Sequence, residues 1–433
     1  MNLLSIKNLN EKNIRKITSF YLLCALPIAF IIGNLLLEII ASLIIFTFIF
    51  DQYIKKVKIN FKEIWFPVIF ILYITINTYI KTHDIELTLK SFFYCRFIIL
   101  IFAIQWILDT NLKVEIFFKF FVIIIFFFLF DLIFQFIFKV NLIGISASES
   151  YIKGMHLKIF EGKINRYSGF FGDELIAGSF LSKFFLITIF YFLNIQKNKL
   201  MSIFYIILFT FGIFISGERA SLLIFLLSLF LLVLLLDKKT KIIISIFIIL
   251  FASIILNFKN TEIVKRYTQD EPFNIILNYT DKDIKEYLGN LKNTNHGKLF
   301  AASVGMILKS PVTGYGLKGF RNNCDQYNKK YFNEINGSCS THPHNYYLDI
   351  LIDHGIIGMI LLFCLIFKLI HNNFKELNKL NKIFLIYLAI TFWPLITAGS
   401  FFTNWISFTI WLNIGLFLSL SNLNQKNYLK AKL

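Results

Sequence analysis

The sequence predicts an all-α polytopic membrane protein, and three observations carry this prediction. Of the 433 residues, 57% are hydrophobic and only 16% are charged, whereas soluble domains carry about 25% charged residues. The mean hydropathy is +0.67. Many apolar runs reach roughly 20 residues, which is the length of a membrane-spanning helix. Lysines gather in the short segments between these runs, as the positive-inside rule requires.

Hydropathy predicts about twelve transmembrane helices. The first two are separated by little more than Gly33-Asn34. The predicted spans cover 18–33, 35–50, 64–80, 92–109, 116–138, 174–194, 200–216, 219–236, 241–257, 344–367, 382–398 and 401–420.

These spans divide the chain into three parts. Residues 1–257 contain transmembrane helices 1–9, residues 258–343 form a large periplasmic loop, and residues 344–433 contain helices 10–12 and a cytoplasmic tail. The loop is expected to be partly helical, because His296–Ser310 has apolar residues at helical spacing. Pro311 and the glycines after it end that helix and turn the chain.

The distribution of lysines predicts that both termini are cytoplasmic. With a cytoplasmic N-terminus, the short outside loops carry little positive charge, and an even number of spans returns the basic C-terminal tail to the same side. The lysines that fall inside are Lys55, Lys56, Lys58, Lys62, Lys113, Lys197, Lys199, Lys238, Lys239, Lys241, Lys368, Lys375, Lys379, Lys382, Lys426, Lys430 and Lys432.

This distribution also explains the formal net charge of +18. Outside the spans there is no basic face with interleaved aromatic residues, so the sequence does not predict a nucleic-acid partner. The partner that the charge and the hydropathy indicate is the lipid bilayer.

Two of the five cysteines, Cys324 and Cys339, fall in the large outside loop. An oxidising compartment favours a disulfide between them, which would pin the chain just before the tenth span. The other three lie in spans, where a cysteine acts as a small apolar residue.

Polar groups stand where the large loop re-enters the membrane, in "STHPHNYYLDILIDHGIIG". His344 is expected at the outer surface, and Asn345, Asp349 and Asp353 follow on one face of a helix. An ionisable group inside a span usually faces the protein interior or a water-filled cavity. We therefore expect a polar stripe that begins at His344 and faces a cavity, while His354 is a packed histidine without a role.

The same stretch resembles the signature of a known family. His344, Asn345, Gly355 and Gly358 form the pattern His-Asn, nine residues, Gly, two residues, Gly. This pattern resembles that of the O-antigen ligase family, which includes the related O-antigen polymerases. Upstream, "PVTGYGLKGF" (311–320) is similar to the Pro-x-x-Gly-x-Gly segment of that family.

Two further stretches are similar to family motifs. "SGERASLL" resembles a turn whose arginine contacts the pyrophosphate of the donor, and this role falls on Arg219. A guanidinium suits it, because its rigid fork matches phosphate oxygens and stays charged. In "NRYSGFFGDELIAG", Arg166 and Gly169 correspond to a second arginine motif. The alternatives are an arginine that snorkels at the membrane edge for Arg219 and a solvated loop arginine for Arg166.

One position departs from the family pattern. Where the family often has an arginine before its Pro-x-x-Gly-x-Gly segment, this chain has His296. Lys298 and Arg321 are the candidates to replace the lost charge. His342 also lies near His344 and the two aspartates, but the intervening Pro343 and the lack of an acidic motif in the first outside loop favour metal-independent chemistry without a cofactor.

The resemblance implies a GT-C-like glycosyltransferase of the bacterial inner membrane. It implies a donor glycan on undecaprenyl diphosphate, Arg219 and Arg166 on the diphosphate, His344 as the catalytic base, and inversion at the anomeric carbon. A ligase transfers the glycan to lipid A–core, whereas a polymerase transfers it to another lipid-linked repeat. A flippase or transporter is the remaining alternative, but it predicts interrupted spans in corresponding positions of two halves, which are not evident.

Overall fold

A computed structural model describes residues 14–57, 61–149, 165–257, 264, 267, 295–331, 339–371, 382–394 and 399–432. Among these residues, eight helices are long and apolar enough to cross a membrane. The prediction of an all-α membrane protein is therefore confirmed. Each of the twelve predicted spans falls on a helix, although Lys199–Ile215, Arg219–Leu235 and Lys382–Thr391 are shorter apolar helices. Part of the large loop lies outside the described residues, namely 258–294 apart from positions 264 and 267, and 332–338.

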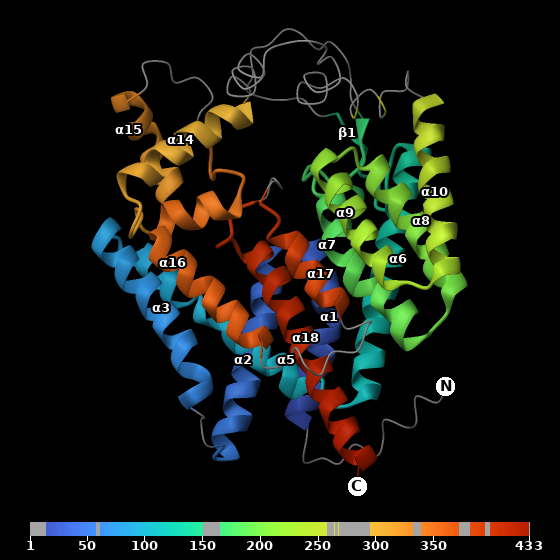
Figure 1. The fold of residues 1–433 in the computed structure, drawn as a ribbon, viewed down its shortest axis with the longest axis horizontal. Helices are drawn as coiled ribbons and strands as arrows, with labels where there is room; N and C mark the ends of the chain where they lie inside the picture. The colour runs from blue at the N-terminus through green and yellow to red at the C-terminus, as the bar shows by residue number, and fades with distance from the viewer. Residues whose placement is uncertain are drawn as a thin grey trace. The chain divides into compact units, whose positions relative to one another are not determined.

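The helices follow one another along the chain in the order shown in Figure 1. They are α1 Ile14–Ile32, α2 Asn34–Ile54, α3 Phe61–Thr82, α4 Ile85–Phe92, α5 Cys95–Ile107, α6 Asn111–Phe138, α7 Ala177–Phe190, α8 Lys199–Ile215, α9 Arg219–Leu235, α10 Lys238–Asn257, α14 Asn295–Lys309, α15 Gly319–Tyr331, α16 Tyr346–His371, α17 Lys382–Thr391 and α18 Asn404–Lys432. The two-residue strands β1 (Ser148–Glu149) and β2 (Asn165–Arg166) pair antiparallel.

The chain forms two compact units. The first unit comprises Met1–Phe117, Lys298–Asn381 and Thr397–Leu433, and the second comprises Phe118–Gly297 and Lys382–Ile396. In the first unit α1 packs on α2, α5 packs on α18, and α3 lies beside α16 (Figure 1). In the second unit α7 packs against α8, α9 and α17.

In the first unit, polar side chains fasten the buried contact between α5 and α18. Trp411 Nε1 donates to Tyr94 Oη at 3.0 Å, and Ser407 Oγ donates to the same oxygen at 3.1 Å. Gly415 allows the helices to approach, since a Cβ there would lie 2.7 Å from a side-chain carbon of Ile104. Small residues and interhelical hydrogen bonds are the usual means of association between helices in a membrane.

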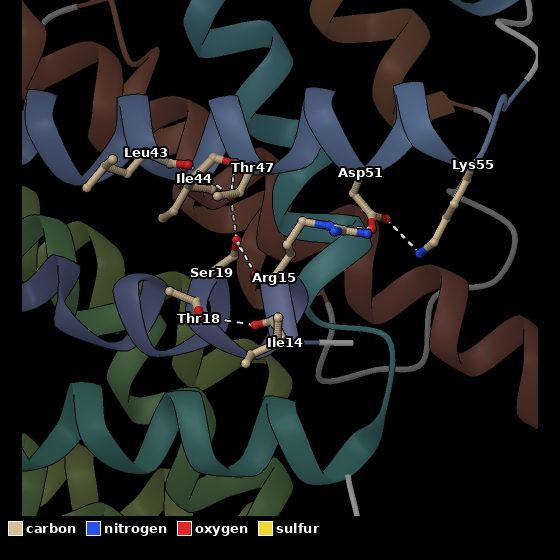
Figure 2. Close-up of polar contacts among 9 residues, drawn as sticks. All are labelled: Ile14, Arg15, Thr18, Ser19, Leu43, Ile44, Thr47, Asp51 and Lys55. Carbon is tan, nitrogen blue, oxygen red and sulfur yellow. Dashed lines mark hydrogen bonds and ion pairs between the residues drawn. The ribbon is translucent and has the colours of Figure 1, made fainter. Parts of the chain in front are cut away.

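The contact between α1 and α2 is polar near one end (Figure 2). Ser19 Oγ and Thr47 Oγ1 are 2.6 Å apart, and each oxygen also lies within hydrogen-bond distance of a backbone carbonyl of its own helix. The buried carboxylate of Asp51 accepts from Arg15 Nε at 3.3 Å and from Lys55 Nζ at 2.6 Å. Two cations thus pair with one buried carboxylate. The sequence predicts that this end of the helix pair lies on the cytoplasmic side.

The helix predicted over 92–109 begins earlier and is broken. Asp84 caps the start of α4, where its carboxylate accepts from Leu87 N at 3.1 Å. The chain then turns at Phe93 and Tyr94 before α5 begins. Hydropathy missed the first piece because α4 carries charged residues, Glu86 and Lys90, on one side.

Candidate functional site

In the first unit, the predicted catalytic histidine stands just before α16. His344 has a positive φ of 57°, and the next residue, Asn345, is buried. The side-chain oxygen of Asn345 accepts from Tyr347 N at 2.9 Å and from Leu348 N at 3.2 Å. These bonds satisfy two of the amide groups that a helix leaves without partners at its first turn. Asn345 therefore fixes the start of α16 and, with it, the position of His344.

The helix α16 is interrupted by the segment that carries the Pro-x-x-Gly-x-Gly motif. Gly355 has a φ of 63°, which breaks the helix, and Ile356 N donates to Pro311 O at 2.9 Å. A Cβ on Gly355 would lie 2.2 Å from Val312 O. The backbones of the two motifs are therefore in direct contact. At the point of closest approach only glycine fits, because it has no Cβ.

Asp353 completes this junction. Its carboxylate accepts from Lys318 N at 3.0 Å and from Gly319 N at 2.8 Å, and its carbonyl accepts from Gly316 N at 2.8 Å. Because Gly319 begins α15, the side chain acts as a cap supplied from another helix. The carboxylate therefore holds the loop segment in place through two backbone hydrogen bonds.

Asp349 lies one turn earlier in α16, and it too accepts hydrogen bonds from a segment that is distant in the chain. Its buried carboxylate accepts from Ser400 Oγ at 2.9 Å and from Phe401 N at 2.8 Å. These two residues lie just before α18. The two aspartates thus connect α16 to different segments of the first unit, and each buried carboxyl group is satisfied by hydrogen bonds, as a low-dielectric site requires.

A disulfide also stabilises this region. Cys324 of α15 and Cys339 are joined by a disulfide, with their Cα atoms 5.8 Å apart. Cys324 belongs to a buried cluster with Met306, Phe320 and Ile352, which ties α14, α15 and α16 together. The chain that leads to His344 therefore starts from a covalently anchored point. The sequence predicted this pairing and a helix over His296–Ser310, which the structure places at Asn295–Lys309.

In the second unit, Arg219 is the first residue of α9 and follows a tight turn. Gly217 has a φ of 69°, and Glu218 occupies the position before α9 without a side-chain hydrogen bond to the backbone of that helix. The carboxylate of Glu218 reaches across to α7, where it accepts from Gly178 N at 2.8 Å and from Ser179 N at 3.1 Å. It also accepts from Ser221 Oγ at 2.9 Å. This buried acid joins the starts of two helices and so fixes the backbone of Arg219.

Charged groups gather around Glu218. Burial raises its pKa, while the positive charge of Arg166 acts in the opposite direction. Burial lowers the pKa of Arg166; Glu218 raises it and Arg219 lowers it. Burial and then the charge of Arg219 lower the pKa of His296. Arg166, Arg219, His296 and Glu218 are thus electrostatic neighbours within one unit.

The environment of Arg166 is suited to an anion. One terminal nitrogen, Nη2, donates to Leu175 O at 3.2 Å. Its Nε is buried and has no hydrogen-bond partner among the residues that the structure describes. A buried donor without a partner costs free energy, so a guanidinium in this state favours an incoming acceptor.

Two residues of this cluster were missed by sequence reasoning. Glu218 lies inside the arginine motif, and an acid directly before a predicted helix is favoured there by the helix dipole. Lys183 lies in α7, within the electrostatic influence of Glu218. A lysine inside an apolar span is the signal that could have found it, because such residues are rare in membranes.

The remaining predicted residues fall in the two units as follows. Arg321 lies on α15 in the first unit and is exposed. His344, Asn345, Asp349 and Asp353 belong to that same unit, whereas Arg166, Arg219 and His296 belong to the second. Across the described ranges, no group of three or more His, Cys, Asp or Glu residues could hold a metal ion.

Comparison with known protein families gives a match that covers part of the chain. A family model described as O-antigen ligase matches residues 204–363, from within α8 to within α16. This range includes Arg219, the Pro-x-x-Gly-x-Gly segment and His344, but not Arg166. No curated protein matches the chain. Over the matched range the chain is similar to the O-antigen ligase family, the family that its motifs resemble.

Proposed function

We propose that the protein is a membrane glycosyltransferase that transfers a glycan from undecaprenyl diphosphate to lipid A–core. The transfer takes place at the periplasmic face of the bacterial inner membrane, inverts the anomeric carbon and needs no metal ion. The protein has a GT-C-like arrangement, with twelve spans, both termini in the cytoplasm and residues 258–343 in the periplasm.

The observation that carries this proposal is that Arg166 lies near the partly buried Glu218, while Arg219 lies near both Arg166 and His296. Two guanidinium groups near one carboxylate leave an excess of positive charge. A diphosphate that links a lipid to a glycan carries negative charge on both phosphates, and guanidinium forks match such oxygens well. The cluster therefore suits a donor whose leaving group is a diphosphate.

In the proposed reaction, His344 accepts the proton of an acceptor hydroxyl. The hydroxyl oxygen attacks the anomeric carbon, and the bond between that carbon and the diphosphate oxygen breaks. Arg219 and Arg166 stabilise the negative charge that develops on the departing diphosphate. Histidine suits the task of a general base because imidazole ordinarily titrates near neutral pH. Asn345, Asp349 and Asp353 act as positioning residues, since their hydrogen bonds fix the start of α16 and the segments around it.

The experiment is deletion of the gene in its host, followed by complementation with wild type or His344→Ala. We expect deletion to remove the polymer from lipid A–core while lipid-linked polymer accumulates. Wild type restores the attachment, whereas His344→Ala lowers it at least 100-fold, a typical effect of losing a general base. The surface polysaccharide and the lipid-linked pool are compared by gel electrophoresis.

His371→Ala is the matched control, because His371 is exposed in the last turn of the same helix. It should restore attachment fully. Core that carries a single repeat after deletion would identify a polymerase instead, and normal polysaccharide would exclude both activities. Near-normal transfer by stably expressed His344→Ala would remove the histidine from the mechanism.

A further inference from the structure

The helix α4 presents three distinct faces. Leu87 and Ser91 are buried, and Ser91 Oγ lies 2.9 Å from a hydroxyl on α3. A second face is apolar and exposed; it consists of Ile85, Leu89, Phe92 and Phe93. Between these two faces lies a charged edge, where Lys90 pairs with Glu86. An exposed apolar face beside a lysine is the pattern of a helix at the boundary between acyl chains and head groups.

A loop brings two more cations to this edge. Leu317 N donates to Thr78 Oγ1 at 3.3 Å, which holds the loop against α3. The next residue, Lys318, has a φ of 61°, and its backbone is fixed by the hydrogen bond to Asp353. Arg321 follows on the first turn of α15 and is exposed.

These cations lie close together. Burial lowers the pKa of Lys318, and the charges of Lys90 and Arg321 lower it further, while Glu86 acts in the opposite direction. The side chain of Lys90 is 47% exposed and that of Glu86 is 75% exposed. Lys90, Lys318 and Arg321, together with the single carboxylate of Glu86, carry a summed charge of two positive units beside the apolar surface of α4.

A phosphate group matches this arrangement in charge. A phosphate monoester carries about −1.5 to −2 charges at pH 7 and offers three acceptor oxygens. The exposed apolar face of α4 lies next to the cations, so one molecule that carries both a phosphate and acyl chains can satisfy both surfaces. Neither a free anion nor a soluble peptide would use the apolar face in this way.

We propose that Lys90, Lys318 and Arg321 bind a phosphate on the head group of a lipid whose acyl chains lie along α4. If the proposed function holds, this lipid is the glycan acceptor, and the cluster provides a site for it that is separate in sequence from the donor arginines. The site would then select acceptors that carry phosphate.

The test uses the full-length protein in nanodiscs of phosphatidylcholine. Diphosphoryl lipid A and the same lipid after enzymatic dephosphorylation are the two probes, and binding is measured without donor. We expect wild type to prefer the phosphorylated probe. The variant Lys90→Gln/Lys318→Gln/Arg321→Gln should bind that probe roughly tenfold to a hundredfold more weakly and show no preference, because each basic residue contributes attraction to anionic head groups.

Lys238→Gln/Lys239→Gln/Lys241→Gln is the matched control, because it removes the same charge from the start of α10. It should bind both probes as wild type does. If the first triple variant is unstable, the single change Lys90→Glu on an exposed side chain should weaken binding of the phosphorylated probe in the same way. Equal binding of both probes by wild type, unchanged binding by the first triple variant, or displacement of the lipid by millimolar inorganic phosphate would overturn the proposal.

The lipid-binding test can fail or succeed independently of the glycan-transfer test. Binding of the lipid-linked donor, measured on the same triple variant, should remain at the wild-type level. If the wild type transfers no glycan at all, the proposed function fails, while the binding comparison still decides whether the cluster recognises a lipid phosphate.

Discussion

At the scale of single residues, Glu218 organises the cationic cluster of the second unit. Its two oxygens accept from the backbone of α7, and Ser221 on α9 donates to one of them. The acid also offsets part of the charge of Arg166. A buried charge without such partners would be costly, so the arrangement of the two helix starts and the ionisation of Glu218 depend on each other.

This dependence predicts a pH effect on stability. Because the pKa of Glu218 is raised in the folded protein, the stability contributed by its protonated form is fully present below the ordinary pKa of a glutamate. It is lost as the pH rises through the raised pKa. Relative to Glu218→Gln, which does not titrate, the melting temperature of wild type should therefore fall across that acidic window. Thermal unfolding in detergent at several pH values measures this difference, and parallel curves for the two proteins would contradict the assignment.

At the scale of elements, the break in α16 is the feature that the sequence only partly predicted. Hydropathy placed a helix here, and Gly355 was identified as part of a family pattern. The interruption was not predicted, because the apolar pattern continues through the glycine. The partners of Asp349 and Asp353 were also missed, since they lie 51 and 35 residues away. Periodicity assigns residues to a face of a helix, but it does not show which distant amide will meet a carboxylate.

Gly355→Ala tests the junction directly. The positive φ and the close approach of Val312 O should together destabilise the protein by about 2–4 kcal/mol. Gly399→Ala is the matched control, because a Cβ there would make ordinary contacts no closer than 3.5 Å. Melting temperatures of the two purified variants should separate clearly. Equal stability would mean that the loop and the helix do not interlock as described.

At the scale of the whole molecule, the two compact units are each built from segments that are distant in the chain. The first unit combines α1–α5 with α14–α16 and α18, whereas α17 joins the second unit. Hydropathy identified the helices well because burial in lipid requires long apolar runs. It did not predict the two units, because in membranes close packing and a few polar contacts decide which helices pair, and lysine placement informs only orientation.

The predicted orientation can be tested by cysteine labelling of intact spheroplasts. In a background where Cys24, Cys95 and Cys364 are replaced by alanine, Thr341→Cys should react with an impermeant maleimide. Lys197→Cys should react only after the membrane is made permeable. Both positions are exposed, so access depends on the side of the membrane. The reverse labelling pattern would place the two ends of the chain outside.

The interruption of α16 has a consequence for how the sequence can vary. The Pro-x-x-Gly-x-Gly segment and the stretch around Gly355 are held together mainly by backbone hydrogen bonds, from Ile356 to Pro311 and from Gly316 to Asp353. Such bonds constrain the backbone path of both segments, but they place few constraints on the side chains. The two motifs therefore form one structural unit. Neighbouring side chains can differ between related chains, but a chimera must exchange both segments together to preserve the hydrogen bonds between their backbones.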